Sequence, residues 1–172
     1  MALVKIEKWE YERAHAVGIA RCTARWGSKD APHYADKARQ EDNRTAEVAA
    51  ALCELAVAKL TNRYWHGHVW HHTEHQKYRD LPDVGHNIEV RRLRTRDTVA
   101  IRRRQNDKLN LIVFAARVMG PEMDSVEVYG YINQQTGWDI GSPSDYDPEN
   151  THLVHISQLT GYVAKPLSLS MT

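Results

Sequence analysis

Residues 109–119 read LNLIVFAARVM, a run that is apolar at almost every position. A continuous apolar run bounded by turn signals indicates a strand that protein covers on both faces. Gly120-Pro121 breaks the run, and residues 125–132 (SVEVYGYI) then alternate apolar with polar or small side chains, as a strand with one covered face does. These residues predict the interior of a β-sheet.

The chain before this run divides into a helical part and a strand part. Residues 5–24 and 45–61 predict helices, and the second (TAEVAAALCELAVAKL and onward) is apolar almost all round, so we expect it to be buried. Residues 87–93 (NIEVRRL) and 98–103 (TVAIRR) alternate and flank a polar turn, which predicts a hairpin. Helices followed by strands indicate an α/β domain of the α+β type, with the long helix packed on the sheet.

Composition limits the kind of protein. The chain has 172 residues, of which 42% are hydrophobic and 26% charged, so we expect a single packed domain over residues 1–172. It has no apolar run of the ~18 residues that a membrane span requires, and charges near its start do not fit a signal peptide. Cys22 and Cys53 have no CxxC context. We therefore expect a cytoplasmic protein with reduced thiols and no membrane partner.

Charge is distributed unevenly along the chain. Residues 91–108 hold eight basic and two acidic side chains, whereas residues 122–150 hold seven acidic side chains and no Lys or Arg. A concentrated positive segment favours a polyanionic partner such as DNA, although a solvated charged hairpin gives the same composition.

Residues 81–91 (LPDVGHNIEVR) are the strongest candidate for chemistry. The period of a strand places Glu89 and Arg91 on one exposed face, and a turn at Gly85 can return Asp83 to within metal-bridging reach of Glu89. Two carboxylates beside a cation suit a Mg²⁺ site that acts on a phosphodiester. The alternative is an exposed strand face with ordinary charges.

Pro82-Asp83 and Glu89-Val90-Arg91 resemble the PD…(D/E)xK signature of the restriction-endonuclease-like nuclease superfamily. The similarity covers about residues 45–135: CELAVAKL (53–60) resembles the family's upstream helix, and VAIRR, QNDK, LNLIVFAARV and VEVYGYI resemble its later elements. The small stand-alone members of phage type are the most similar.

The resemblance implies a mixed central sheet flanked by helices and a Mg²⁺-dependent deoxyribonuclease, with Mn²⁺ as a substitute metal. Asp83, Glu89 and Glu54 would hold the metal, and Arg91 would contact the scissile phosphate. Glu54 is preferred to Glu47 because Ala-x-Ala-Lys follows it, and we expect it to lie closer to Glu89. The host would be a bacterial or phage-infected cell, and a homodimer is compatible with cutting both strands.

Arg91 departs from the lysine of the signature. Arginine does not lose its proton in proteins and cannot act as a general base, so a non-catalytic nucleic-acid-binding or assembly protein with the same fold is the alternative function. In both cases the DNA backbone would be held by the arginines of the expected hairpin, which are Arg92, Arg94, Arg102, Arg103 and Arg104.

Residues 64–75 (YWHGHVWHHTEH) hold half of the ten histidines. Three interpretations stay open: an ordinary surface loop, a DNA contact in which aromatic rings stack on bases, or a Zn²⁺ site from His68 and His72 or from His71 and His75 on a helix. The third would make the chain a small zinc protein.

Overall fold

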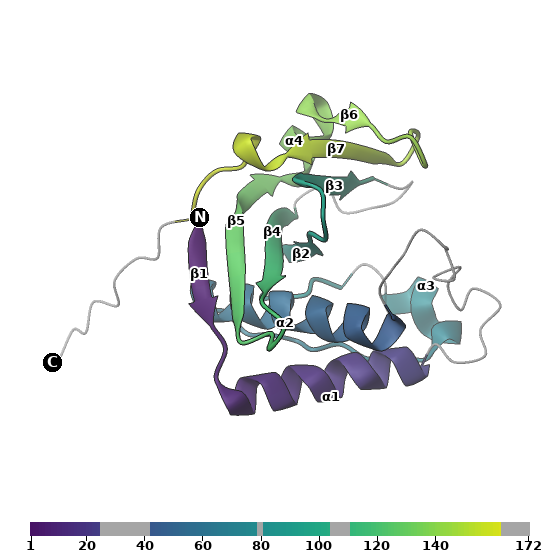
Figure 1. The fold of residues 1–172 in the computed structure, drawn as a ribbon. Coiled ribbons are helices and arrows are strands. Elements are labelled where there is room, and N and C mark those ends of the chain that lie inside the picture. The colour runs from purple at the N-terminus through teal and green to yellow at the C-terminus, as the bar shows by residue number, and fades with distance from the viewer. Residues whose placement is uncertain (25–41, 79–80, 104–110, 163–172) are drawn as a thin grey trace, which may run out of the picture.

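A computed structural model describes residues 1–24, 42–78, 81–103 and 111–162 and has an α+β fold, as the sequence predicts (Figure 1). Its helices are α1 (Lys8–Ala24), α2 (Asn43–Thr61), α3 (His75–Tyr78) and α4 (Gln134–Ile140). Its strands are β1 (Ala2–Lys5), β2 (Ile88–Arg92), β3 (Thr98–Arg102), β4 (Ile112–Met119), β5 (Ser125–Asn133), β6 (Ser142–Pro143) and β7 (Thr151–His155). Short 3₁₀ turns lie at His72–Glu74 and Ile156–Gln158.

The central sheet has four strands in the order β1-β5-β4-β2, and β2 and β4 are parallel while the other pairs are antiparallel. Strand β4 lies inside this sheet, and its residues from Val113 to Ala116 are all buried. Phe114 and Ala116 join the core beneath α2, whereas Val113 and Ala115 join a second core. The predicted burial of this strand on both faces is therefore confirmed.

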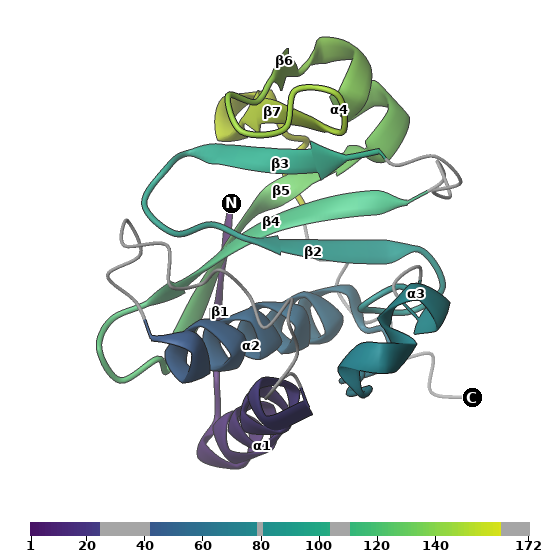
Figure 2. The same ribbon diagram turned by 90° about the vertical axis from the view of Figure 1, so that its right-hand side faces the viewer.

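Helix α2 covers one face of the central sheet, and α1 packs on the outer side of α2 (Figure 2). The two helices approach closely at Gly18, where an added Cβ would come within 2.6 Å of the backbone of Val48. Helix α2 is buried over most of its length, as its apolar sequence predicts. Asp42 caps its start by accepting from the backbone N–H of Arg44 at 2.7 Å.

The predicted hairpin of β2 and β3 is wrong. Strand β3 pairs with β7 in a second sheet, ordered β3-β7-β6, and β2 pairs with β4. Val99 and Ile101 of β3 pack with Val154 of β7 against the second face of the central sheet. This arrangement buries the side chains of Val99 and Ile101. A two-stranded hairpin at the edge of the sheet would leave them exposed.

The N-terminal residues differ from the prediction. Residues 2–5 form a strand that pairs with β5, and helix α1 begins only at Lys8. Val4 and Ile6 point into the core beneath α2, which explains why these few residues are extended. Among the described residues, no helix is long and apolar enough to cross a membrane.

Candidate active site around Asp83 and Glu89

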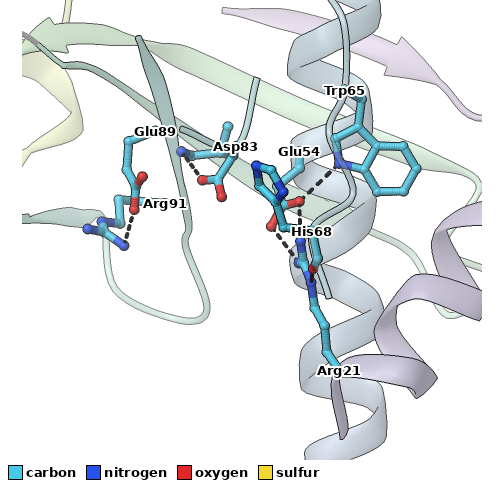
Figure 3. Close-up of polar contacts among 8 residues, drawn as sticks. Arg21, Glu54, Trp65, His68, Asp83, Glu89 and Arg91 are labelled. Atoms are coloured by element: carbon cyan, nitrogen blue, oxygen red, sulfur yellow. Dashed lines mark hydrogen bonds and ion pairs between the residues drawn. The ribbon is translucent and has the colours of Figure 1, made fainter. Parts of the chain in front are cut away.

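Strand β2 presents Glu89 and Arg91 together on its accessible side, as predicted. Ile88 and Val90 alternate with them and are buried. Arg91 Nη1 lies 2.8 Å from Glu89 Oε1, so the two form a partly exposed ion pair. The pair is the left-hand group in Figure 3.

The turn before β2 returns Asp83 to this strand. Gly85 has a positive φ of 58°, and the backbone N–H of Asp83 donates to the carbonyl of Ile88 at 2.9 Å. The Asp83 carboxylate then accepts from the backbone N–H of Val90 at 2.8 Å. The turn predicted from Gly85 is therefore confirmed, and it places Asp83 between Glu54 and the Glu89–Arg91 pair (Figure 3).

Ionisation of the Asp83 carboxylate is unfavourable at this position. Burial raises its pKa well above the ordinary value of 3.8, and the neighbouring charges of Glu89 and Glu54 raise it further. The hydrogen bond from Val90 and the charge of Arg91 act in the opposite direction but do not compensate. A cation bound at Asp83 would favour the ionised form.

Glu54 is buried and fully engaged with protein partners, being 6% exposed. Its Oε1 accepts from Arg21 Nη1 at 2.6 Å, and its Oε2 accepts from Arg21 Nη2 at 2.9 Å and from Trp65 Nε1 at 3.0 Å. A buried carboxylate requires a compensating charge, and for Glu54 this charge comes from Arg21 of α1. Glu54 contributes to the charge around Asp83.

Asp83 lies between Glu54 and the Glu89–Arg91 pair, and the role of these three carboxylates as metal ligands stays a prediction. The described part of the chain contains no group of three or more His, Cys, Asp or Glu residues that could hold a metal ion. The reason is that Arg21 and Trp65 hold the Glu54 carboxylate. Asp83 and Glu89 remain as the carboxylates available to a cation, a number that Mg²⁺ accepts because waters and phosphate oxygens complete its shell.

His68 was not singled out by the sequence as part of this site. Figure 3 places its ring beside Glu54 and toward Asp83. Its Nε2 is buried without a hydrogen-bond partner among the described residues. Burial and the neighbouring His66 lower the pKa of the ring, whereas a hydrogen bond to the backbone of Pro82 acts in the opposite direction. A neutral ring with an unpartnered nitrogen can accept a hydrogen bond from a ligand.

Predictions of zinc coordination by the histidine segment receive no support. Residues 66–71 form no helix, and the short turn His72–Glu74 follows them, so His68 and His72 do not share a helix. The side chain of His75 lies outside the described residues.

The basic residues divide between two places. Arg92 ends β2 and Arg94 follows it, whereas Arg102 and Arg103 lie at the end of β3, on the other sheet. Because β2 and β3 run in opposite directions, these two groups lie at opposite ends of the strands (Figure 2). The guanidinium of Arg103 lies 5.6 Å from the ring centre of Trp138. Arg104 falls outside the described residues.

Comparison with protein-family models, with curated proteins and with solved structures finds no match to this chain in any of the three. The resemblance to the nuclease superfamily therefore rests on the residues of the chain itself.

Proposed function

We propose that this protein is a metal-dependent deoxyribonuclease that hydrolyses phosphodiester bonds, with Asp83 and Glu89 as the carboxylates that hold Mg²⁺ or Mn²⁺. The observation that carries the proposal is the position of Asp83, which lies between Glu54 and the Glu89–Arg91 pair. Its carboxylate is held in place by Val90, and its pKa is raised by burial and by two neighbouring carboxylates. Such a group is costly in a protein that has no cation to bind, and it suits one that does.

The residues present fit a magnesium ion bound by few protein ligands. Asp83 is fixed by a backbone hydrogen bond, and Glu89 is oriented by Arg91, so both carboxylates have defined positions before a ligand binds. The chemistry that a bound Mg²⁺ supplies is polarisation of the phosphate and activation of a water. Glu54 acts differently in this proposal: it fixes Trp65 and Arg21 beside the site.

Arg91 contributes charge and not proton transfer. Its guanidinium pairs with Glu89 and remains protonated, and it can bind a phosphate oxygen as charge develops in displacement. The arginines at the ends of β2 and β3 would hold the DNA backbone on either side. The cytoplasm of a bacterial or phage-infected cell and a homodimer are further predictions of this reading.

Cleavage of labelled DNA in Mg²⁺, in Mn²⁺ and in EDTA tests the proposal. We expect metal-dependent cutting by the wild type, and loss of cutting with retained DNA binding in Glu89→Gln. Asp145→Asn, on an exposed loop, is the matched control and should cut normally. Cutting that persists in Glu89→Gln would refute the assignment.

A non-catalytic nucleic-acid-binding protein is the second candidate function. It is favoured by Arg91, which cannot replace a lysine as a base, and by the engagement of Glu54 with Arg21. In this case the wild type binds DNA and cuts none with either metal.

A further inference from the structure

A row of aromatic rings leads away from Asp83. Residues 64–70 form no helix, and the aromatic side chains at even positions contact one another in sequence. Tyr64 meets His66 edge to face at 5.1 Å between ring centroids, His66 stacks on His68 at 4.8 Å, and His68 is tilted against Trp70 at 5.8 Å. Trp70 continues to Tyr78 at 6.1 Å. We call these five rings the aromatic ladder.

Trp65 anchors the segment that carries these rings. It is buried and donates to Glu54, whereas its neighbour Tyr64 is 68% exposed. Gly67 has a φ of 56° and lies against the ring of Trp65, where a side chain would be strained. The buried ion pair of Glu54 with Arg21 therefore holds the segment that carries Tyr64, and Arg21 Nε also donates to the carbonyl of His68 at 2.8 Å.

Hydrogen bonds join the ladder directly to the turn that holds Asp83. The backbone N–H of His66 donates to the carbonyl of Asp83 at 3.2 Å, and that of Gly85 donates to the carbonyl of Tyr64 at 2.8 Å. A hydrogen bond of 2.7 Å also links His66 Nε2 with the carbonyl of Gly85. The rings and the candidate metal carboxylate consequently form one rigid unit.

The outer surface of the ladder combines an exposed ring with positive charge. Tyr64 is 68% exposed although its ring contacts His66, so most of the phenol faces solvent. Arg63 and Lys77 are exposed, and Lys77 Nζ lies 4.7 Å from the ring centre of Tyr78. Rings that stack on base faces, next to cations that attract phosphates, are the means by which proteins bind single-stranded nucleic acid.

We propose that the aromatic ladder binds unpaired nucleotides, and that the substrate of the site is DNA with a single-stranded segment beside the bond to be cut. The inference rests on the proposed function for the cutting, but the stacking can be measured without it. Bases within an intact duplex stack on each other and offer no face to Tyr64, whereas unpaired bases do. Rings that neighbours already hold in place lose little freedom on binding.

Binding in EDTA tests the stacking. Fluorescence anisotropy would compare a labelled oligo-dT of about 20 nucleotides with a labelled, blunt-ended duplex of about 20 base pairs. We expect Tyr64→Ala to raise Kd for the single strand by about 5-fold or more, as loss of one stacked base does, with little change for the duplex. Tyr64→Phe keeps the ring and should bind as the wild type does.

Tyr146→Ala is the matched control because Tyr146 is 65% exposed and lies on the loop after β6. It should bind both DNAs as the wild type does. The inference is overturned if the wild type binds no single strand, if Tyr64→Ala weakens both DNAs equally or neither, or if Tyr146→Ala has the same effect as Tyr64→Ala.

Cleavage assays on the same two DNAs separate this inference from the proposed function. Metal-dependent cutting of the duplex, with unchanged binding of single strands by Tyr64→Ala, would overturn the proposal that the aromatic ladder binds unpaired nucleotides. The proposed nuclease activity would then stand. Binding of single strands that depends on Tyr64, without cutting in Mg²⁺ or Mn²⁺, supports the ladder and overturns the nuclease.

Discussion

Replacing Asp83 by Asn should make the protein more stable in metal-free buffer at neutral pH. Asn keeps an oxygen that can accept from the backbone N–H of Val90, which the Asp83 carboxylate binds at 2.8 Å, and it removes the negative charge beside Glu89 and Glu54. Each unit by which the folded state raises the pKa of Asp83 costs about 1.4 kcal/mol of stability once the group is ionised. For a chain of 172 residues this corresponds to about 3–5 °C in Tm for each unit.

The gain should depend on pH in a defined direction. Because the pKa of Asp83 is raised in the folded state, that state binds the proton more tightly than the unfolded chain does. The stability penalty is therefore absent below the ordinary pKa of 3.8, grows as the pH rises from there to the folded-state pKa, and is constant above it. The difference in Tm between Asp83→Asn and wild type should follow the same course.

Mg²⁺ should reduce the stability advantage of Asp83→Asn over the wild type. A ligand that binds only the folded state at 100 times its Kd adds about 2.7 kcal/mol, so Mg²⁺ should raise the Tm of the wild type and leave that of Asp83→Asn unchanged. Differential scanning fluorimetry between about pH 4 and 8 measures both effects as shifts in Tm of a few degrees. Asp145→Asn is the control, because Asp145 is exposed. An Asp83→Asn variant that melts below the wild type in EDTA at pH 7.5 would refute the electrostatic argument.

Three further changes test other parts of the structure. Arg21→Ala leaves a buried carboxylate without its partner and should lower the free energy of unfolding by about 3–5 kcal/mol in urea titration; a loss below about 1 kcal/mol would mean that the ion pair is not needed. Gly18→Ala places a methyl group 2.6 Å from the backbone of α2 and should cost about 1–3 kcal/mol, whereas Gly161→Ala, which meets nothing within 4 Å, should cost less. Changing Arg102 and Arg103 to Gln should reduce the slope of log Kd against log salt by about 0.9 for each lost phosphate contact, and an unchanged slope would exclude both from the DNA interface.

Patterns within one segment predicted the local structure well. The alternation in IEVR fixed which side chains of β2 are buried, and Gly85 identified the turn at Asp83, since both depend only on neighbours in sequence. The apolar run at 109–119 likewise predicted a strand covered on both faces.

Contacts between distant segments could not be predicted in the same way. The alternation of TVAIR is equally compatible with pairing to β2 or to β7, because it specifies the buried side chains and not the partner strand. A charged Glu54 on an apolar helix requires a partner of opposite charge. That partner, Arg21, lies 33 residues away in the sequence and on another helix. The sequence of α1, which carries Arg13 and Arg21, gives no sign of which carboxylate each arginine meets.

The pairing of β1 with β5 and of β3 with β7 also determines when each strand can be completed during synthesis. Val4 faces Val126, and Val99 faces Val154, so each early strand must wait for a partner that leaves the ribosome much later. At the usual rate of elongation β1 waits on the order of ten seconds for β5, whereas α1 and α2 are both present well before that. Nascent chains should therefore acquire the helical pair early, and translation that stops before residue 151 should yield products in which Val99 and Ile101 lack their covering strand and promote aggregation.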